Sequence, residues 1–591
     1  MGLAACAPKS PIIPYVPPRQ RVTRAPASQN ETGVIVLGLS TATLEQLIGQ
    51  YRDLSVRIVN PKHGLYELFG QSLATVRREL RGQNVLIEKN SYVPLIKKSK
   101  VIDDYSNTAP FSVVDNPLVF NVDQYQKVFL TGADLNFVNS CRLGPSNVSP
   151  VIHLMSNQGT NLQQTWFYFN LGNSINLDAS NSQAPTNDGK LSYLWIVTAP
   201  QDSLLQPQYS RSATIRYTPD TTGLHRFTLI VKDSNGYCQP LYSHFFVSAK
   251  VPFEPGPAFP ASLSSTFVTP NRFLNLFRIG ATKAWKLSTG KGITIAIIDS
   301  GVNYNHPALS PNIWINRGEI PNNGIDDDGD GFVDDVVGYN FAQNNPYPYD
   351  DYGHGSHVAG IAASSIFGAA RGAKIMPLKV TIFASGFDIA TVAGAIYYAV
   401  DQGAKIINLS MGWPNDYPVM RRVLKYTEQK DVLLTVSAGN SSTNNDVIPQ
   451  YPASYRHFPN IISVAASNYY GALTSYSNYG PETVDIAAPG GTTKRPIISA
   501  YKENPRHELY AKMAGTSMAS PLVAGVAAQV WSEDRHLTDT EVKQILLETG
   551  EPSAALKNRI KSGRVLNAQA AVKYARNLNG PSHSVILTRP L

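Results

Sequence analysis

The sequence is sparing in cysteine, in charge and in long apolar runs. Cysteine contributes only 3 of 591 residues, which excludes a small scaffold held together by disulfides. No run of about 18 apolar residues occurs, so no segment is a candidate for a membrane-spanning helix. Charged residues make up 16% and hydrophobic residues 43% of the chain, a balance that argues against wholesale disorder. At roughly 150 residues per domain, the length predicts about three or four globular domains.

The net charge of +8 comes from one end of the chain. Residues 1–100 carry 14 Lys and Arg against 6 Asp and Glu, which accounts for the whole excess. A solvated basic face explains such a segment more simply than a nucleic-acid interface, which would extend over a folded domain. We therefore expect no nucleic-acid partner.

The first 32 residues combine a cysteine motif with a proline-rich stretch. Cys6 ends Leu3-Ala4-Ala5-Cys6, which resembles the lipobox of bacterial lipoproteins, where the thiol is acylated. The charged and apolar segments that normally precede a lipobox are missing, so a lipid anchor and a chance similarity both remain open. Six prolines between residues 7 and 30 favour an extended tether. With a lipid on Cys6, the protein would be exported and anchored to a membrane.

Residues 33–100 alternate short strands and helices. Strands are expected at residues 33–39, 56–59, 65–69 and 84–88, and helices at residues 43–51 and 72–80. This βαββαβ order predicts a ferredoxin-like α+β domain, a fold shared by proteins of many functions. Residues 101–125 follow as a linker.

Residues 126–249 show the period-two pattern of an all-β domain. Strands at residues 174–178, 191–197, 213–217 and 226–232 predict an Ig-like sandwich, and their turn spacings resemble polycystin-type (PKD) modules. Trp195 is interpreted as a core residue. Cys141 and Cys238 both fall here, and they form either one disulfide in an oxidising compartment or two buried thiols. A linker spans residues 250–270, marked by four prolines between residues 252 and 260.

Residues 271–578 alternate apolar strands with longer helices. Strands are expected at residues 293–298, 375–380, 406–409, 432–437, 461–466 and 484–488, and helices at residues 357–365, 389–402 and 517–531. This alternation predicts an α/β domain with a doubly wound, mostly parallel sheet. Functional sites in such folds lie at the carboxyl ends of strands. Residues 579–591 form a tail.

Reactive side chains stand at strand ends and helix starts of this domain. Asp299 ends an apolar strand, His354 lies in a glycine-rich segment, and Ser517 begins an apolar helix. A hydroxyl, an imidazole and a carboxylate supply a nucleophile, a general base and a group that orients the base. The side-chain amide of Asn440, after another strand, is suited to donate to an oxyanion.

These segments closely resemble the signatures of subtilisin-like serine proteases. Asp299-Ser300-Gly301, the segment from His354 to Gly360 and the segment from Gly515 to Pro521 match in the family's order, with Ser356 replacing the usual Thr. The resemblance implies an endopeptidase that acts on proteins or peptides through an acyl-enzyme on Ser517. It also implies that substrate is bound by the following residues: Ser410, Met411, Gly412, Ala438, Gly439 and Pro452.

The family resemblance gives residues 33–100 a role as well. Subtilases are commonly made with a βαββαβ prodomain that assists folding and then inhibits the enzyme by laying its C-terminal tail in the cleft. A self-inhibited, self-processing precursor is therefore expected. Neutral residues near the specificity pocket, Met411 and Trp413, favour a broad or apolar preference for the substrate side chain bound there. We interpret the second histidine, His357, as structural.

An acidic insert separates Asp299 from His354. Asp326, Asp328 and Asp330 alternate and are followed by Gly331, as at the start of an EF-hand-type loop. The twelfth position is Val337 instead of Glu, so Asp334 or Asp335 would have to supply the remaining carboxylate. Six acids in ten residues repel one another, which favours a structural Ca²⁺ ion over a merely solvated loop.

Two other functions remain compatible with the sequence. In the first, the sandwich binds a partner and the protease fold stays silent, as in an adhesion or scaffolding protein. In the second, an amine captures the acyl-enzyme, as in a transpeptidase or cyclising enzyme.

Overall fold

The computed structural model describes most of residues 33–93 and 268–578, together with separate segments between residues 137 and 253. Residues 52–53, 382–385 and 503–508 are excepted from these ranges. The predictions for the tether with Cys6, for the linker at 101–125, for Cys141 and for the tail at 579–591 lie outside the described residues. In the part that is described, no helix is long and apolar enough to cross a membrane.

The N-terminal domain contains the strands and helices expected between residues 33 and 90, in the expected order. The elements are β1 (Val34–Leu37), α1 (Thr41–Gln50), β2 (Ser55–Asn60), β3 (Leu65–Phe69), α2 (Leu73–Glu79) and β4 (Leu86–Lys89). Their sheet has the strand order β2-β3-β1-β4, and every pairing in it is antiparallel. Ser40 and Ser72 cap the two helices by accepting from Thr43 N and Thr75 N. A further short strand, β5 (Tyr92–Val93), follows in the chain but is not part of this sheet.

The segments described between residues 137 and 253 form two sheets whose strands pair mostly in the antiparallel sense. The first has the order β10-β9-β12-β13-β7 and the second the order β11-β8-β6. Their strands are β6 (His153–Leu154), β7 (Trp166–Asn170), β8 (Ile175–Asp178), β9 (Leu191–Thr198), β10 (Gln208–Ser210), β11 (Thr214–Tyr217), β12 (Gly223–Asp233) and β13 (Cys238–Ser248). Trp195 is fully buried, as predicted, and its Nε1 donates to the carbonyl of Ser212 at 3.1 Å. Cys238 is disulfide-bonded.

The C-terminal domain is built on a sheet of nine described strands in the order β15-β16-β14-β18-β19-β20-β21-β25-β24. All its pairings are parallel except the last, between β25 and β24. The strands are β14 (Thr294–Asp299), β15 (Tyr339–Asn340), β16 (Lys374–Lys379), β18 (Ile406–Leu409), β19 (Leu433–Ser437), β20 (Ile461–Ser467), β21 (Ile486–Pro489), β24 (Glu551–Pro552) and β25 (Arg564–Val565). The predicted doubly wound α/β architecture is therefore present.

Alternate residues of each strand face opposite sides of this sheet. On β14, Ile295 and Ile297 join one buried cluster, whereas Ala296 and Ile298 join the other. The first cluster contains α8 (His354–Ala363), α11 (Thr516–Glu533), α12 (Asp539–Thr549) and α13 (Ala568–Leu578). The second contains α9 (Ile389–Asp401) and α10 (Pro418–Gln429). Helices on both faces bury the central strands, such as β18 and β19, which explains their largely apolar sequences.

Several elements were not predicted from the sequence. They include α10, α12, α13, the short helices α6 (Leu274–Arg278) and α7 (Ala281–Ala284), and the hairpin of β22 (Ile497–Ala500) with β23 (Tyr510–Met513). Helix α12 carries a complete capping box, in which Thr538 and Glu541 bond each other's backbone N–H groups. That signal was present in the sequence.

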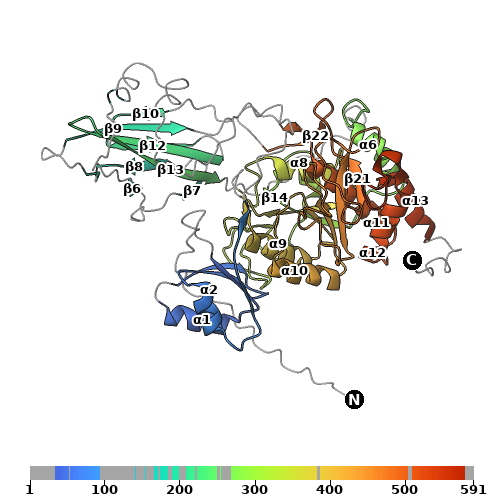
Figure 1. The fold of residues 1–591 in the computed structure, drawn as a ribbon, viewed down its shortest axis with the longest axis horizontal. Coiled ribbons are helices and arrows are strands. Elements are labelled where there is room, and N and C mark those ends of the chain that lie inside the picture. The colour runs from blue at the N-terminus through green and yellow to red at the C-terminus, as the bar shows by residue number, and fades with distance from the viewer. Residues whose placement is uncertain are drawn as a thin grey trace, which may run out of the picture.

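The N-terminal domain packs against α9 and α10 of the large domain (Figure 1). Four of its apolar residues belong to the same buried cluster as these helices: Ile35, Leu37, Val59 and Leu65. Strand β5 pairs antiparallel with β17 (Phe387–Asp388), which leads directly into α9. The two domains are therefore joined by both side-chain packing and a backbone ladder.

Candidate active site

Asp299 is the last residue of β14, and it lies at the carboxyl edge of the sheet. The residue is only 3% exposed, and its Oδ1 accepts from the N–H of Ser300 at 2.7 Å. His354 Nδ1 lies 2.8 Å from Oδ1 and 3.0 Å from Oδ2 of Asp299. A carboxylate only accepts, so Nδ1 carries the proton and Nε2 is the basic nitrogen of the neutral ring. This is the tautomer that a general base requires.

The turn before α8 places His354 beside Asp299. A Cβ added to Gly355 would lie 2.0 Å from the carbonyl oxygen of Gly301, so only glycine permits this approach. Beneath the turn, the fully buried carboxylate of Asp350 accepts from Ser300 Oγ, Gly353 N and Ser356 N at 2.7–2.8 Å. Asp350 is a positioning residue that was not predicted, since its partners are spread over 57 residues of sequence.

Ser356 keeps the hydroxyl of the threonine that it replaces. Its Oγ donates to Asp350 Oδ2 at 2.6 Å and accepts from Asn303 N at 2.8 Å. The hydroxyl thus satisfies two buried groups, which a residue without one would leave unpaired.

Ser517 is the second residue of α11, at the amino end of the helix. Its Oγ donates to the carbonyl of Ser410 at 3.3 Å, and Ser410 Oγ donates back to the carbonyl of Ser517 at 2.9 Å. The helix dipole favours negative charge at this end of the helix. The position suits an oxygen nucleophile and the oxyanion that its attack creates.

Asn440 follows β19, and its amide is held in one orientation. Its Oδ1 accepts from both the backbone N–H and the Oγ1 of Thr516, each at 2.9 Å. Since the oxygen is engaged, Nδ2 is the group presented to the site. A Cβ added to Gly515 would lie 3.5 Å from this nitrogen, so the glycine keeps space in front of it. Asn440 and the predicted nucleophile therefore share one preorganised anion site.

The predicted substrate-binding residues lie on both sides of this site. Ser410, Met411 and Gly412 follow β18, while Ala438 and Gly439 follow β19, the neighbouring strand in the sheet. Pro452 is joined to Tyr451 by a cis peptide bond. Trp413, which was expected near the specificity pocket, is fully buried and packs edge-on against Phe387 at a centroid distance of 6.2 Å.

Comparison with known proteins matches this domain to characterised relatives. The model of the subtilase family matches residues 290–571. Thermitase of Thermoactinomyces vulgaris is 33% identical over 303 residues, which are 50% of this chain and 94% of thermitase. The chain belongs to the subtilase family. The thermophilic serine proteinase of Bacillus sp. (strain AK1) is 35% identical over 298 residues, which span 49% of this chain and 64% of that protein.

Among solved structures, a cold adapted subtilisin-like serine proteinase is 26% identical, with a TM-score of 0.39, over 48% of this chain and 90% of that one. The family assignment confirms the predicted enzyme class. The catalytic domain of this subtilase is that of a subtilisin-like serine endopeptidase.

The second histidine of the subtilase signature is a core residue. His357 is fully buried, and its Nε2 donates to the carbonyl of Ile497 at 3.1 Å. The pKa of His357 is lowered to about 3, mainly by burial and to a smaller extent by the nearby His354. A ring that stays neutral and faces the backbone cannot serve as the catalytic base.

The acidic insert of this subtilase brings together a different set of acids from the one predicted. Glu319, Asp326 and Asp328 have carboxylate oxygens within 4.8 Å of one another. Asp330 and Asp334 were predicted in place of Glu319. Asp330 instead accepts from Gln402 Nε2 at 2.6 Å, and Asp334 accepts from the N–H groups of residues 323 and 324 at 3.0 and 3.1 Å. Glu319 escaped prediction because it precedes the EF-hand-like pattern.

We predict that Asn440→Ala lowers kcat by about 100- to 1000-fold with little change in KM, because the lost donor acts on the transition state. Steady-state kinetics on a peptide substrate measures both constants. A matched Asn567→Ala variant, on the far loop before α13, should retain wild-type kcat. A loss of less than tenfold in Asn440→Ala would contradict the assigned role.

We predict that buried His357 makes the folded domain sensitive to acid. Its folded pKa lies below the ordinary value of 6.5, so its contribution is complete above pH 6.5 and is lost as pH falls towards 3. Between pH 7 and pH 4 the loss should be about 3 kcal/mol. Denaturant unfolding of the wild type and of His357→Asn, which keeps a donor but does not titrate, measures the difference. Parallel stability curves for the two proteins would refute the prediction.

Proposed function

We propose that this subtilase is an exported endopeptidase, made as a self-inhibited precursor that hydrolyses peptide bonds through an acyl-enzyme on Ser517. His354 Nε2 takes the proton of Ser517 Oγ as the oxygen attacks the substrate carbonyl. Asn440 Nδ2 and the Ser517 N–H stabilise the resulting oxyanion. His354 then gives the proton to the leaving amine, and water attacks the acyl-enzyme by the same route. The Nδ1 contact of His354 with Asp299, at 2.8 Å, is the observation that carries this proposal.

The N-terminal domain is proposed as the inhibitory prodomain. Its support begins with a buried polar cluster at the interface. Arg57 donates to both carboxylate oxygens of Asp388 at 3.1 and 2.9 Å, and it also pairs with Glu67. Asn90 Nδ2 donates to Asp388 at 3.2 Å and to Glu67 at 2.7 Å. Because Asp388 also caps α9 through Thr391 N, the cluster ties the N-terminal domain to the start of that helix.

The N-terminal domain also supplies acceptors to the ends of two helices. The carbonyl of Ser91 accepts from Ile389 N at 3.2 Å, at the start of α9. Glu88 Oε1 accepts from Val419 N at 3.3 Å, at the start of α10. Helix amino ends attract negative groups, so these hydrogen bonds help to fix the orientation of the N-terminal domain, which apolar packing alone does not define.

The position of strand β5 favours a C-terminal tail of the prodomain that runs towards the substrate site. It pairs with β17, and Phe387 of β17 packs against Trp413, which directly follows Gly412. A substrate strand that replaced β5 would use the same backbone groups of β17. The prodomain would therefore inhibit by competing for the edge on which substrates bind.

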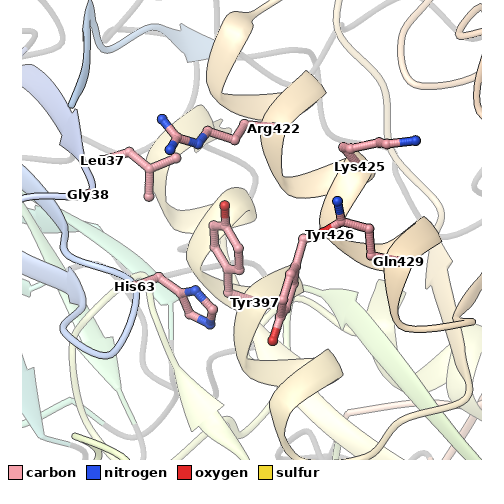
Figure 2. Close-up of a pocket in the computed structure, with 8 residues that line it drawn as sticks. All are labelled: Leu37, Gly38, His63, Tyr397, Arg422, Lys425, Tyr426 and Gln429. Carbon is pink, nitrogen blue, oxygen red and sulfur yellow. The ribbon is translucent and has the colours of Figure 1, made fainter. Parts of the chain in front are cut away.

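A pocket lined by aromatic side chains lies between the N-terminal domain and the large domain. His63 stacks on Tyr397 with ring centroids 4.0 Å apart, and its Nε2 donates to Asp401 at 2.8 Å. Figure 2 shows the pocket of about 360 Å³ beside them, with walls from both domains: Leu37, Gly38, His63, Tyr397, Arg422, Lys425, Tyr426 and Gln429. An interface with polar contacts and a hollow rim resembles those between separable partners.

A calcium ion is proposed as a structural cofactor of the insert. The three converging carboxylates of Glu319, Asp326 and Asp328 offer the hard oxygen ligands that Ca²⁺ prefers. Beside them, burial and neighbouring acids raise the pKa of Asp330 to about 7 and of Asp335 to about 8. Among the ion pairs of the described residues, none joins Lys or Arg to these acids. A bound cation would supply the missing positive charge and fix the insert, with no part in bond breaking.

Export and anchoring complete the proposal. The disulfide at Cys238 supports an oxidising compartment outside the cytoplasm. Cys141 is its proposed partner, and Cys6 is the proposed site of a lipid anchor. The Ig-like sandwich would remain attached to the catalytic domain after cleavage near residues 94–100.

We expect the purified wild-type chain to shorten to discrete fragments, while Ser517→Ala keeps its full length, because only the hydroxyl can form the acyl-enzyme. Intact mass followed over time measures both, and the fragment masses locate the junctions. Full-length wild type with no activity on casein would favour the silent scaffold instead.

We expect Arg57→Ala to weaken the hold of the prodomain by about 100-fold, because a buried ion pair loses its cation and leaves two acids unpaired. The readout is an earlier onset of peptidase activity after purification. Arg77→Ala, an exposed arginine on α2, should behave as wild type. An unchanged onset in Arg57→Ala would argue against this interface.

We expect removal of Ca²⁺ by a chelator to lower the Tm of the wild type by about 5 °C or more, since a bound ion stabilises only the folded state. Glu319→Gln should start from a lower Tm and respond less to added Ca²⁺. Asp327→Asn, a neighbouring acid outside the converging group, should keep the full response. Equal responses in all three proteins would exclude this site.

A further inference from the structure

The pocket between the N-terminal domain and the large domain has walls that neither domain completes alone. Leu37, Gly38 and His63 line it from the N-terminal domain, and α9 and α10 supply the other residues labelled in Figure 2. Its volume of about 360 Å³ lies at the small end of the range for ligand sites. The complete pocket therefore exists only while the two domains are docked.

The hydroxyl of Tyr397 is an unused donor at this pocket. Tyr397 is only 4% exposed, and within the described chain no hydrogen bond reaches its hydroxyl oxygen. Stacking on His63, with ring centroids 4.0 Å apart, fixes the ring. Burial raises the pKa of Tyr397 to about 12, so the hydroxyl keeps its proton at neutral pH and remains able to donate. An acceptor atom of a ligand would pair with this hydroxyl.

Arg422 supplies a positive charge on the same side of the pocket. Figure 2 shows its side chain and the Tyr397 hydroxyl pointing to that side. The charge of Arg422 also opposes the rise in the pKa of Tyr397, as a nearby guanidinium does. Among the described residues, no carboxylate pairs with Arg422. Because a guanidinium matches a carboxylate with two parallel hydrogen bonds, the two groups together suit a carboxylate ligand.

The other charges close to the pocket have partners within the protein. Asp401 pairs with Lys62 at 3.3 Å and also accepts from His63 Nε2 at 2.8 Å. Lys425 pairs with Glu428 at 2.9 Å on the same helix. The pocket therefore retains a net attraction for one negative charge.

The rest of the lining suits a flat apolar body. The rings of His63, Tyr397 and Tyr426 lie with their centroids 4.0–5.2 Å apart, and buried Leu37 adds an aliphatic side chain from β1. A ligand with one aromatic ring would bury apolar surface against these side chains. The site thus combines an aromatic wall with a point that recognises a carboxylate.

We propose that this interdomain pocket binds a small aromatic carboxylate, held by Arg422 and by the hydroxyl of Tyr397. The ligand is either a free aromatic acid or the carboxyl terminus of a peptide that ends in an aromatic residue. Because it binds only the docked form, it favours the attached N-terminal domain over the released one. It would therefore delay activation, a part of the inference that rests on the precursor function proposed above.

Binding is measured by titration calorimetry on the full chain with Ser517→Ala, which lacks the proposed nucleophile. Phenylacetate should bind at one site, and neutral phenylacetamide should bind about tenfold more weakly or worse. In the same chain, Arg422→Ala should weaken phenylacetate about tenfold or more. Tyr397→Phe, which keeps the ring and its stacking, should weaken it about threefold or more.

Arg421→Ala is the matched control for these variants. This neighbouring arginine on α10 donates to Asp416 at 2.9 Å and does not line the pocket. It should bind phenylacetate as tightly as the parent chain. No binding to the parent chain, or equal binding to Arg422→Ala, would overturn the inference.

Two further probes identify the kind of ligand. Tighter binding of the tripeptide Ala-Ala-Phe with a free carboxyl group than of phenylacetate assigns the site to a peptide terminus, and the reverse order assigns it to a free acid. Inorganic phosphate should bind at least tenfold more weakly than phenylacetate, because it has no ring to bury. Phosphate that binds as tightly as phenylacetate would overturn the aromatic assignment.

The effect on activation is read in the wild type as the lag before peptidase activity appears. Phenylacetate at ten times its Kd should favour the docked form about tenfold and lengthen the lag. The lag of Arg422→Ala should not respond, which separates this effect from inhibition at the active site. Binding to the Ser517→Ala chain with an unchanged wild-type lag refutes the control of activation alone. A wild type that never becomes active refutes the proposed peptidase function, whereas the titration still decides the site.

Discussion

The alignment of three neighbouring parallel strands at one edge of the sheet is the constraint on which the site depends. Strands β14, β18 and β19 are adjacent, so Asp299, the Ser410–Gly412 segment and the residues before Asn440 stand in a row. Neighbouring strands lie about 4.8 Å apart, which sets the spacing of the segments that follow them at this edge. Because both faces of these strands pack against buried clusters, a shift in register would disrupt close packing on both sides and is strongly opposed.

Small residues let the two helices that carry His354 and Ser517 meet at that edge. A Cβ on Gly525 of α11 would lie 2.6 Å from the carbonyl of Ala362 on α8, so the helix backbones approach as closely as glycine allows. The same device acts at Gly355, against the end of β14. Catalytic geometry in this protein is therefore largely a product of close backbone packing, with the side chains oriented afterwards by Asp299, Asp350 and Thr516.

The proposed catalytic residues could be picked out in the sequence because each is embedded in a short segment with its own local pattern of strand end, glycine and helix start. Residues that support them from a distance could not be picked out in this way. Asp350 has ordinary sequence neighbours, and its role appears only when segments far apart in the chain come together. The insert shows an intermediate case: Asp326 and Asp328 belong to the alternating acids, whereas Glu319, whose carboxylate converges with theirs, lies outside that pattern. Helix α12 could have been predicted from its capping box.

The kcat of Asp299→Asn tests the proposed catalytic arrangement most directly. An amide at this position can donate to His354 Nδ1, so it stabilises the wrong tautomer and gives no support to the imidazolium. We predict a loss of about 10⁴-fold in kcat near neutral pH, with KM and the folded structure little changed. A variant that keeps more than a tenth of the wild-type kcat would show that His354 does not depend on Asp299, and the proposed catalytic arrangement would be wrong.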